Sequence, residues 1–368
     1  MVSGHMRGMD EFEIEHLNRL ERIRSLLEIT PDTHITLVGD VMLDRFVTGE
    51  AETLATTAPA PALRVIHTNQ SPGASAHIAQ SLNGFGTNTR FHSAIGNDEA
   101  GQSIIQILNQ SGIDTSRILT INEQTTLVKT RYIASRRGLL DRRQMLLQTD
   151  SGGKAPLNEN DATKILDSAI NDLHGAGALI ISDYDNGVIS ENVASKLINA
   201  ANAADIHTII DPKLSSLGKA MNADIALFEM RGIELIMKRQ LLSNLEETRN
   251  HLFDTYGWNA MLVIGGVHGT QLYLKNGDYE HHQCRVIEPR QQLGLHDAAA
   301  TALAHALVSG ATLTDAACLA HAACEVILGA EASREFVSKD VLEKLRDGEL
   351  NPMMAVMGGQ IKISGDMG

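Results

Sequence analysis

The sequence predicts an α/β fold with a mainly parallel central sheet. Between Ala155 and Leu328, short apolar runs of strand length alternate with longer segments of helical periodicity. Such alternation is typical of doubly wound sheets that carry helices on both faces. The strand segments read ALIISDY, HTIIDPK, ADIALF and NAMLVIG. With 368 residues, the chain has the length of one large domain or two smaller ones.

Composition is that of an ordinary globular protein. Apolar residues make up 43% and charged residues 21%, and the net charge is -14. We therefore expect no nucleic-acid partner, although a local cationic pocket for phosphate is compatible with this charge. The three cysteines lack a CxxC spacing, which favours core packing over a zinc or disulfide site. Since no long apolar run or signal-peptide pattern lies near the N-terminus, we expect no membrane span and a cytoplasmic protein.

The N-terminal segment 1–33 is expected to form a tail and one amphipathic helix. Within Asp10–Glu28, apolar side chains recur on one stripe among charged residues. The stripe consists of Leu17, Leu20, Ile23, Leu26 and Leu27. We expect this helix to pack on the domain that follows, and a dimer contact is the alternative.

The segment His34–Phe46 reads as a buried parallel strand that ends at Gly39-Asp40. Ligands in open α/β sheets bind beyond such strand ends. Its sequence GDVMLDR, from Gly39 to Arg45, resembles the opening of bacterial heptose-7-phosphate kinases, a subgroup of the PfkB/ribokinase family of carbohydrate kinases. In that family the first strand delivers an acid to the sugar hydroxyls, so the resemblance implies Asp40 or Asp44 as a substrate-binding residue. A turn aspartate is the alternative.

The resemblance runs from about His34 to Gly329 and implies a ribokinase-like three-layer sandwich with a small β lid. We expect this domain to span residues 34–335, with the lid formed by about 45–72 and 127–148. In the heptose kinase subgroup, the positions of Thr53, Thr56 and Thr57 would be Arg, Pro and Glu, so charged groups that could meet a phosphorylated sugar are absent here.

The segment Ser71–Ala79 corresponds to the family's R-P-G-G-A-A-N-V-A. Gly73 agrees with the first glycine of the pair, Ala74 replaces the second, and His77 replaces the asparagine that would bind the sugar. An imidazole lacks the paired donor and acceptor of an amide, so sugar recognition is expected to be altered or lost. The alternative for His77 is a polar helix residue without a role in binding.

Several positions implied to surround the nucleotide depart from the family. Lys213, in the matching I-D-P-K motif, is a candidate for contacting phosphate, with a solvated lysine as the alternative. In place of the family's T-P-N-x-x-E, Glu229 stands at the asparagine and Gly232 at the glutamate, while Glu234 follows two residues later. The resemblance implies ATP and Mg²⁺ as cofactors if the protein is active, with Glu229 and Glu234 as the remaining metal candidates. Loss of this network should slow phosphoryl transfer by orders of magnitude.

A glycine turn follows the segment NAMLVIG. Gly265, Gly266 and Gly269 stand where the family has L-V-T-R-S-E-x-G, which borders the nucleotide. The Thr, Arg, Ser and Glu types are absent, so a plain turn after a strand is as good an interpretation as nucleotide binding.

Asp297 begins an alanine-rich run that reads as a buried helix. The unpaired N–H groups and dipole of a helix N-terminus favour a carboxylate or a phosphate there. The preceding residues, QQLGLHD from Gln291, resemble the family signature D-x-x-G-A-G-D, whose last aspartate is the catalytic base. The implied anion hole is formed by Gly294, Leu295 and His296. The last two add side chains where backbone amides should approach the phosphate.

The C-terminal segment 336–368 has a different character. Its portion NPMMAVMGGQIKISGDMG resembles part of the sterol-carrier-protein-2 family, over about the last thirty residues of the chain. A lipid tunnel cannot be built from so short a fragment, so we expect it to pack on the kinase-like body. A truncated lipid-binding module is the alternative.

Together these features predict a sugar-kinase-like protein with impaired catalysis that binds a ligand, such as a sugar or a sugar phosphate. An active ATP-dependent kinase with Asp297 as base is one alternative, and a lipid-associated protein is another. Because family members commonly pair through their lids, we expect a homodimer.

Overall fold

A computed structural model describes residues 11–135, 144–153, 155–284, 289, 292–330 and 337–346. Its central layer is a sheet of nine strands. These are β1 (His34–Gly39), β4 (Thr89–Gly96), β5 (Ile118–Ile121), β8 (Ala176–Ser182), β9 (His207–Asp211), β10 (Ile225–Glu229), β11 (Ala260–Ile264), β12 (Thr270–Leu274) and β13 (Tyr279–His282).

The strand order across the central sheet is β13-β12-β11-β10-β9-β8-β1-β4-β5. All neighbours from β11 to β5 pair in parallel, whereas β12 and β13 are antiparallel additions at one edge. The inner strands are almost continuously apolar because helices cover both of their faces, as the buried residues Leu37, Ile180 and Ile209 illustrate. This sheet confirms the predicted mainly parallel α/β class.

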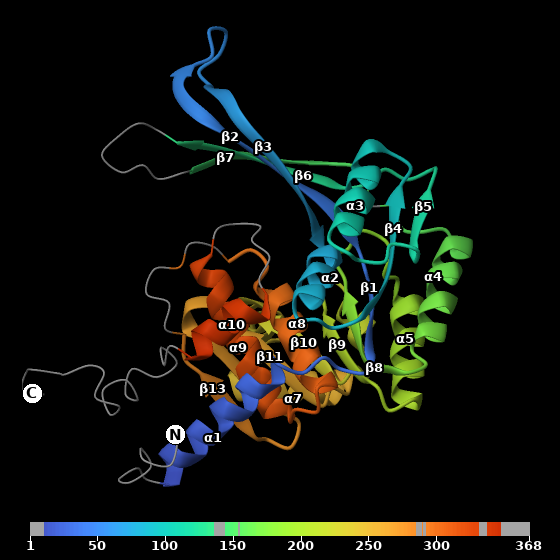
Figure 1. Cartoon of the computed structure of the whole chain (residues 1–368), viewed down its shortest axis with the longest axis vertical. Helices are drawn as coiled ribbons and strands as arrows, with labels where there is room; N and C mark the ends of the chain where they lie inside the picture. Colours follow the sequence, from blue (N-terminus) through green and yellow to red (C-terminus); the bar gives the residue numbers. More distant parts are fainter. Residues whose placement is uncertain are drawn as a thin grey trace, which may run out of the picture.

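Two helical layers enclose the sheet (Figure 1). One layer contains α1 (Glu11–Leu26), α2 (Ser75–Gly84), α3 (Glu99–Gln110), α8 (Leu295–Val308), α9 (Leu313–Gly329) and α10 (Ser338–Arg346). The other contains α4 (Glu159–Asp172), α5 (Glu191–Ala203), α6 (Met230–Gln240) and α7 (Leu245–Tyr256). Helices α8 and α9 are rich in buried alanines, and small side chains of this kind let them lie close to the sheet and to each other.

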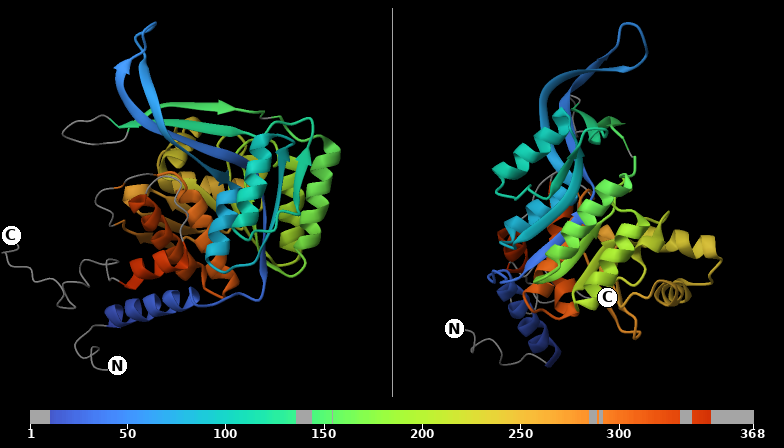
Figure 2. Two further views of the ribbon diagram at one scale, coloured as in Figure 1. Left: turned by 45° about the horizontal axis from the view of Figure 1, so that its top comes forward. Right: turned by 90° about the vertical axis from the view of Figure 1, so that its right-hand side faces the viewer.

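A second sheet of four strands arches over the carboxyl ends of the central strands (Figure 2). Its strands are β2 (Val41–Leu54), β3 (Pro61–Ala74), β6 (Val128–Ser135) and β7 (Gln144–Ser151), in the order β3-β2-β6-β7. Only Asp40 separates β1 from β2, so this lid is a direct extension of the first central strand. The lid therefore places side chains of β2, β3 and β6 above the sheet edge at which ligands bind in α/β folds.

Helix α1 is anchored by an arginine that reaches two other elements. The Arg19 guanidinium pairs with Asp315 at 3.0 Å and with Glu280 of β13. Ile23 of the same helix is fully buried. In the part of the chain that the structure describes, no helix combines the length and apolarity needed to cross a bilayer. The segment that resembles sterol-carrier-protein-2, from residue 351 onward, lies outside the described residues.

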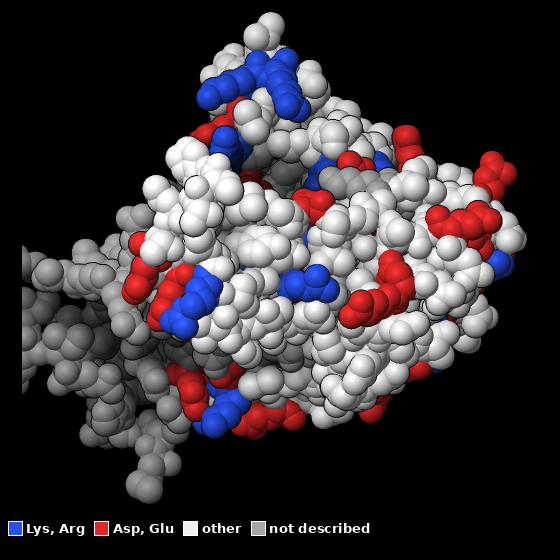
Figure 3. All heavy atoms as spheres, turned by 90° about the horizontal axis from the view of Figure 1, so that it is seen from above, with Lys and Arg blue, Asp and Glu red and all other residues white. Residues whose placement is uncertain are grey.

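Charged side chains are mixed on the face that includes the lid. Lys and Arg form small separate groups between Asp and Glu there, without a continuous basic stripe among the described residues of this face (Figure 3).

Candidate functional site

Asp297 lies in the first turn of α8, beneath the lid, and is 6% exposed. The residue before the helix, Gly294, has φ 87°, a left-handed conformation that suits glycine. Both carboxylate oxygens have partners. The Tyr184 hydroxyl donates to Oδ1 at 2.8 Å, and Nδ1 of His77 lies 3.3 Å from Oδ2.

Tyr184 follows β8 and contacts both Asp297 and Lys213. Burial and then the charge of Asp297 raise the pKa of the phenol well above its ordinary value, so it stays protonated and donates its hydrogen bond. The Lys213 ammonium lies 4.6 Å from the centre of the Tyr184 ring, a cation–π arrangement. The sequence analysis did not foresee the contact of Tyr184 with Asp297.

A cavity of about 70 Å³, called here the acceptor cavity, lies beside Asp297 under the lid. Of the residues predicted to bind substrate, Asp44, Gly73 and His77 line it, and Asp40 does not. His77, which replaces the family's sugar-binding asparagine, is also the residue that contacts Asp297. Its ring packs against the Gly294 turn, where an added Cβ would lie 3.2 Å from Cε1 of the histidine.

Two cations from β6, Lys129 and Arg131, also line the acceptor cavity. Arg131 forms an ion pair with Asp44. Among the described residues, Lys129 has neither an ion-pair nor a hydrogen-bond partner. The two residues are two apart on a strand and so face the same side. This spacing is readable in the sequence, but it identifies the site only once the lid is known to fold over Asp297.

Asp40 does not line the acceptor cavity but holds the loop that follows β8. Its carboxylate is fully buried and accepts backbone N–H bonds from Tyr184 at 2.8 Å, Asn186 at 3.1 Å and Val188 at 2.9 Å. Burial raises the pKa of Asp40 in spite of these donors. The acid at the end of β1 thus fixes the loop that carries Tyr184.

Ala74, at the family's second glycine position, has strained backbone angles. Its φ is 57° and its ψ is -132°, a region that residues with a Cβ rarely adopt. The neighbouring Gly73 is required by space, because a Cβ there would lie 2.1 Å from Oδ2 of Asp44. The close approach of β3 to β2 beside the acceptor cavity therefore requires glycine at position 73 and strains the backbone of Ala74.

A second cavity, of about 340 Å³, lies at the carboxyl ends of β9 and β10 and at the start of α8. We call it the His296 cavity. Within it, Nδ1 of His296 lies 3.0 Å from Oδ1 of Asp211, at ion-pair distance but without hydrogen-bond alignment, and Nε2 lies 3.8 Å from Glu229. Lys213 approaches the other oxygen of Asp211 at 3.3 Å. Lys213, Glu229 and the predicted anion-hole residues Gly294, Leu295 and His296 all line this cavity.

The charges in the His296 cavity stabilise one another. Burial alone would lower the pKa of His296, but the facing carboxylate of Asp211, with Glu229, raises it. Burial would likewise raise the pKa of Asp211, and His296 with Lys213 lowers it. The position that is a glycine in the family signature is therefore occupied by an imidazole that favours its charged form and is held by an acid.

The residues present do not fit the magnesium network that the resemblance implies. Glu229 is 67% exposed at the rim of the His296 cavity, whereas Glu234 is exposed on α6 and is not among the described residues that line it. Within the described ranges, no group of three or more His, Cys, Asp or Glu is placed to hold a metal ion.

The predicted glycine turn lies near the His296 cavity but does not line it. It forms a 3-10 helix, η2 (Gly266–His268), bracketed by a hydrogen bond of 2.8 Å from Gly265 N–H to the Gly269 carbonyl. A Cβ at Gly266 would lie 3.6 Å from Nε2 of Gln292, which does line the cavity. The turn thus borders the residues before α8. Its glycines, Gly265, Gly266 and Gly269, contribute no side chain that could contact a phosphate.

An acid at the start of a helix, a lid sheet and cavities at the carboxyl ends of parallel strands together define the ribokinase-like fold of carbohydrate kinases. Residues 32–339 match the pfkB family of carbohydrate kinases, and the chain belongs to this family. The predicted family and ribokinase-like fold are thereby confirmed.

Among curated proteins, the chain is 31% identical over 320 residues to the bifunctional protein HldE of Paramagnetospirillum magneticum and 28% identical over 297 residues to that of Helicobacter pylori. The matches cover 85% and 80% of this chain and 62% of each relative, so the chain spans about three-fifths of their length.

Solved structures of low sequence identity share the fold. Arabidopsis thaliana ribokinase complexed with ribose and ATP aligns with a TM-score of 0.64 at 15% identity, over 86% of this chain and 99% of that one. Phosphofructokinase-2 from Escherichia coli, in a tetrameric inhibited form, aligns with a TM-score of 0.68 at 15% identity, over 85% and 98%.

Proposed function

We propose that this chain binds a sugar or sugar phosphate beside Asp297 and is impaired in phosphoryl transfer. The observation that carries the proposal is the engagement of both Asp297 oxygens, by Tyr184 and by His77. A general base must come within hydrogen-bond distance of the proton it removes. Because both partners also line the acceptor cavity, an incoming hydroxyl competes with them for the carboxylate.

The phosphate side of the site supports the same proposal. Phosphoryl transfer depends on positioned donors that meet the charge developing on the transferred group. Here the side chain of His296 is directed at Asp211 and Glu229, and Gly232 supplies no carboxylate where the family signature has glutamate. With these groups absent or engaged, the remaining acid can bind a hydroxyl but has little to stabilise a transferring phosphoryl group.

The lid cations support a phosphorylated ligand. Lys129 and Arg131, the latter paired with Asp44, line a small cavity together with Gly73, His77 and Asp297. A phosphate placed between two cations forms charge-assisted hydrogen bonds, which are stronger than neutral ones. This assigns to β6 the phosphate contacts that the threonines at positions 53, 56 and 57 do not provide.

Calorimetry with a panel of sugars and sugar phosphates tests the binding function. We expect at least one sugar phosphate to bind, and Lys129→Gln to weaken it roughly tenfold or more while leaving the unphosphorylated sugar unchanged. Lys164→Gln, which removes an exposed lysine of α4, is the control. Absence of binding by every sugar phosphate, or equal effects of both variants, would contradict the proposal.

An active ATP-dependent sugar or sugar-phosphate kinase with Asp297 as base is the second candidate. It is favoured by the position of Asp297 in the first turn of α8, directly after His296, whose pKa is raised by the charges of Asp211 and Glu229. ADP release that requires Asp297 in assays with Mg-ATP and the same panel would select this candidate over the first.

We further propose a homodimer formed through the lid. The lid sheet carries exposed apolar side chains, among which Leu54 and Ile66 are 62% and 63% exposed. Exposed apolar side chains gathered on one element mark interaction surfaces. Sedimentation velocity should give a dimer for the wild type and a monomer for Ile66→Glu, and a monomeric wild type would refute this assembly.

The lipid-associated alternative concerns residues beyond Arg346, which the structure does not describe. A fluorescent fatty acid should bind the full chain and not a version that ends near Ser338 if the tail holds lipid. Equal binding, or no binding, by both chains removes this alternative.

A further inference from the structure

A third cavity, separate from the two beside α8, lies in the layer formed by α4 to α7. It encloses about 450 Å³ between α6, α7 and the 3-10 helix η1 (Leu217–Ala220). We call it the η1 cavity. Its volume is in the range of small-molecule sites, about 300 to 1,000 Å³. Leu214 lines both the η1 cavity and the His296 cavity, so the two are neighbours along one segment of chain.

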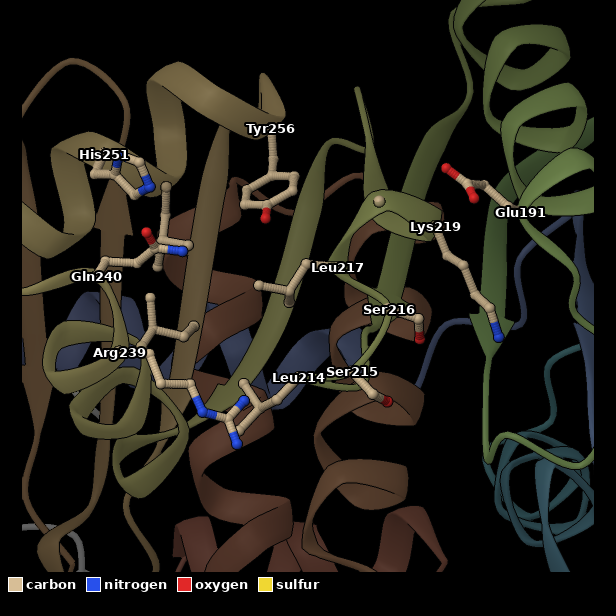
Figure 4. Close-up of a pocket in the computed structure, with 13 residues that line it drawn as sticks. Glu191, Leu214, Ser215, Ser216, Leu217, Lys219, Arg239, Gln240, His251 and Tyr256 are labelled. Atoms are coloured by element: carbon tan, nitrogen blue, oxygen red, sulfur yellow. The ribbon is translucent and has the colours of Figure 1, made fainter.

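One wall of the η1 cavity is apolar and flat. Leu214, Leu217 and Leu252 line it, and the Tyr256 ring projects into it from α7 (Figure 4). That ring is stacked on Trp258, with centroids 5.1 Å apart and planes inclined by 15°. Because Trp258 is fully buried, the orientation of the Tyr256 ring is fixed by the core. This wall suits a flat apolar group of a ligand.

Polar side chains line the other part of the cavity: Arg239 and Gln240 come from the end of α6, with the Arg239 guanidinium directed toward Leu214, and His251 of α7 lies apart from that guanidinium (Figure 4). The Arg239 guanidinium forms no ion pair or hydrogen bond with any residue that the structure describes. Lys219, across the cavity, is already engaged by Asp183 at 2.8 Å, and the carboxylate among the lining residues is that of Glu191. In a chain of net charge -14, the Arg239 guanidinium, which has no partner among the described residues, is a local site that attracts an anion.

We propose that the η1 cavity is a binding site for a small organic anion with a flat apolar body. Its anionic group, a phosphate or carboxylate, lies at Arg239, and its flat body lies against Tyr256 and Leu217. A guanidinium presents paired donors that match such anions in geometry. The site is distinct from the cavities beside Asp297 and does not depend on phosphoryl transfer there.

Adenosine monophosphate is a suitable probe because it joins a flat ring to a phosphate. Calorimetry on the full chain should show that it binds more tightly than adenosine or inorganic phosphate. Arg239→Gln should weaken its binding roughly tenfold or more. The matched control is Lys238→Gln, since Lys238 is an exposed cation in the same last turn of α6 but does not line the cavity, and we expect a change below about twofold.

A nucleotide also matches the chemistry of the His296 cavity, so Lys213→Gln is measured in parallel. Binding lost with Arg239→Gln and retained with Lys213→Gln supports the proposal. Three results would overturn it: no binding of adenosine monophosphate at millimolar concentration, loss only with Lys213→Gln, or equal loss with Arg239→Gln and Lys238→Gln. Unchanged thermal unfolding of the variants shows that each remains folded.

Discussion

The hydroxyl of Tyr184 donates a hydrogen bond of 2.8 Å to Oδ1 of Asp297. Removing it leaves a buried carboxylate with one fewer donor, and hydrogen bonds to charged groups contribute about 1.5–3 kcal/mol. We therefore expect Tyr184→Phe to lower the free energy of unfolding in urea by about that amount. Tyr132→Phe is the control, because the Tyr132 hydroxyl makes no hydrogen bond with a described residue, and its effect should stay within about 0.5 kcal/mol. Equal losses in both variants would contradict this role of Tyr184.

The ion pair of His296 and Asp211 predicts a pH dependence of stability. Because Asp211 and Glu229 raise the pKa of His296 on folding, its contribution is fully present below the unfolded pKa of about 6.5 and is lost as pH rises through the folded value. The difference in unfolding free energy between wild type and His296→Gln should therefore shrink as pH is raised from about 6 to 9.

This difference in unfolding free energy between wild type and His296→Gln reports the titration of His296 separately from that of the other histidines. Burial lowers the pKa values of His92 and His305, which titrate with the opposite sign in both proteins and cancel. The contact of Lys213 with Asp211 is common to both proteins. A difference that is constant with pH, or that grows as pH rises, would show that His296 is not charged in the folded protein.

The backbone of Ala74 predicts a stabilising substitution. At φ 57° and ψ -132°, a Cβ is unfavourable, and relief of such strain is worth about 1 kcal/mol or more. Ala74→Gly should raise the free energy of unfolding by roughly that amount. Ala200→Gly, inside α5, should instead lower it by about 1 kcal/mol. Destabilisation by both substitutions would refute the strain at Ala74.

Restoring residues of the family signatures should restore turnover if their loss impairs catalysis. The substituted positions are changed together, as His77→Asn, Glu229→Asn, Gly232→Glu, Leu295→Ala and His296→Gly. A Cβ at Gly232 would make only ordinary contacts, the nearest 3.5 Å from Leu214, so that change has room. Removal of one donor from an oxyanion hole typically costs about 10²–10³-fold, and we expect ADP release to rise by at least the lower value when these groups are restored.

The control for this variant is the same set of changes with Asp297→Asn added, which should abolish the gain. A gain that survives the loss of the acid would come from a different reaction. No gain in a folded variant that still binds the sugar phosphate would show that the impairment has another cause.

The sequence predicted the fold well because its periodicities are local. Alternating apolar runs define the parallel strands, and the alanine-rich run after Asp297 defines α8, with the acid in its first turn. The same reasoning placed Lys213, Glu229 and the residues before Asp297 near one another, since they follow neighbouring strands or begin a helix at one sheet edge.

The partners of those residues depend on tertiary contacts, which spacing does not encode. Asp40 and Asp44 are equivalent candidates in the sequence, yet one accepts three backbone N–H groups and the other lines the acceptor cavity. Likewise, the contact of Tyr184 with Asp297 joins residues 113 positions apart. The place of Lys129 in the cavity follows from the arch of the lid and from no local motif.

The most direct test of impaired phosphoryl transfer is ADP release from Mg-ATP by the wild-type chain, measured with saturating sugar phosphate and compared with Asp297→Asn. We predict that a sugar phosphate binds both proteins and that their rates of ADP release are indistinguishable. A wild-type rate that exceeds the Asp297→Asn rate by about 10²-fold or more, as a working general base would give, would contradict the account.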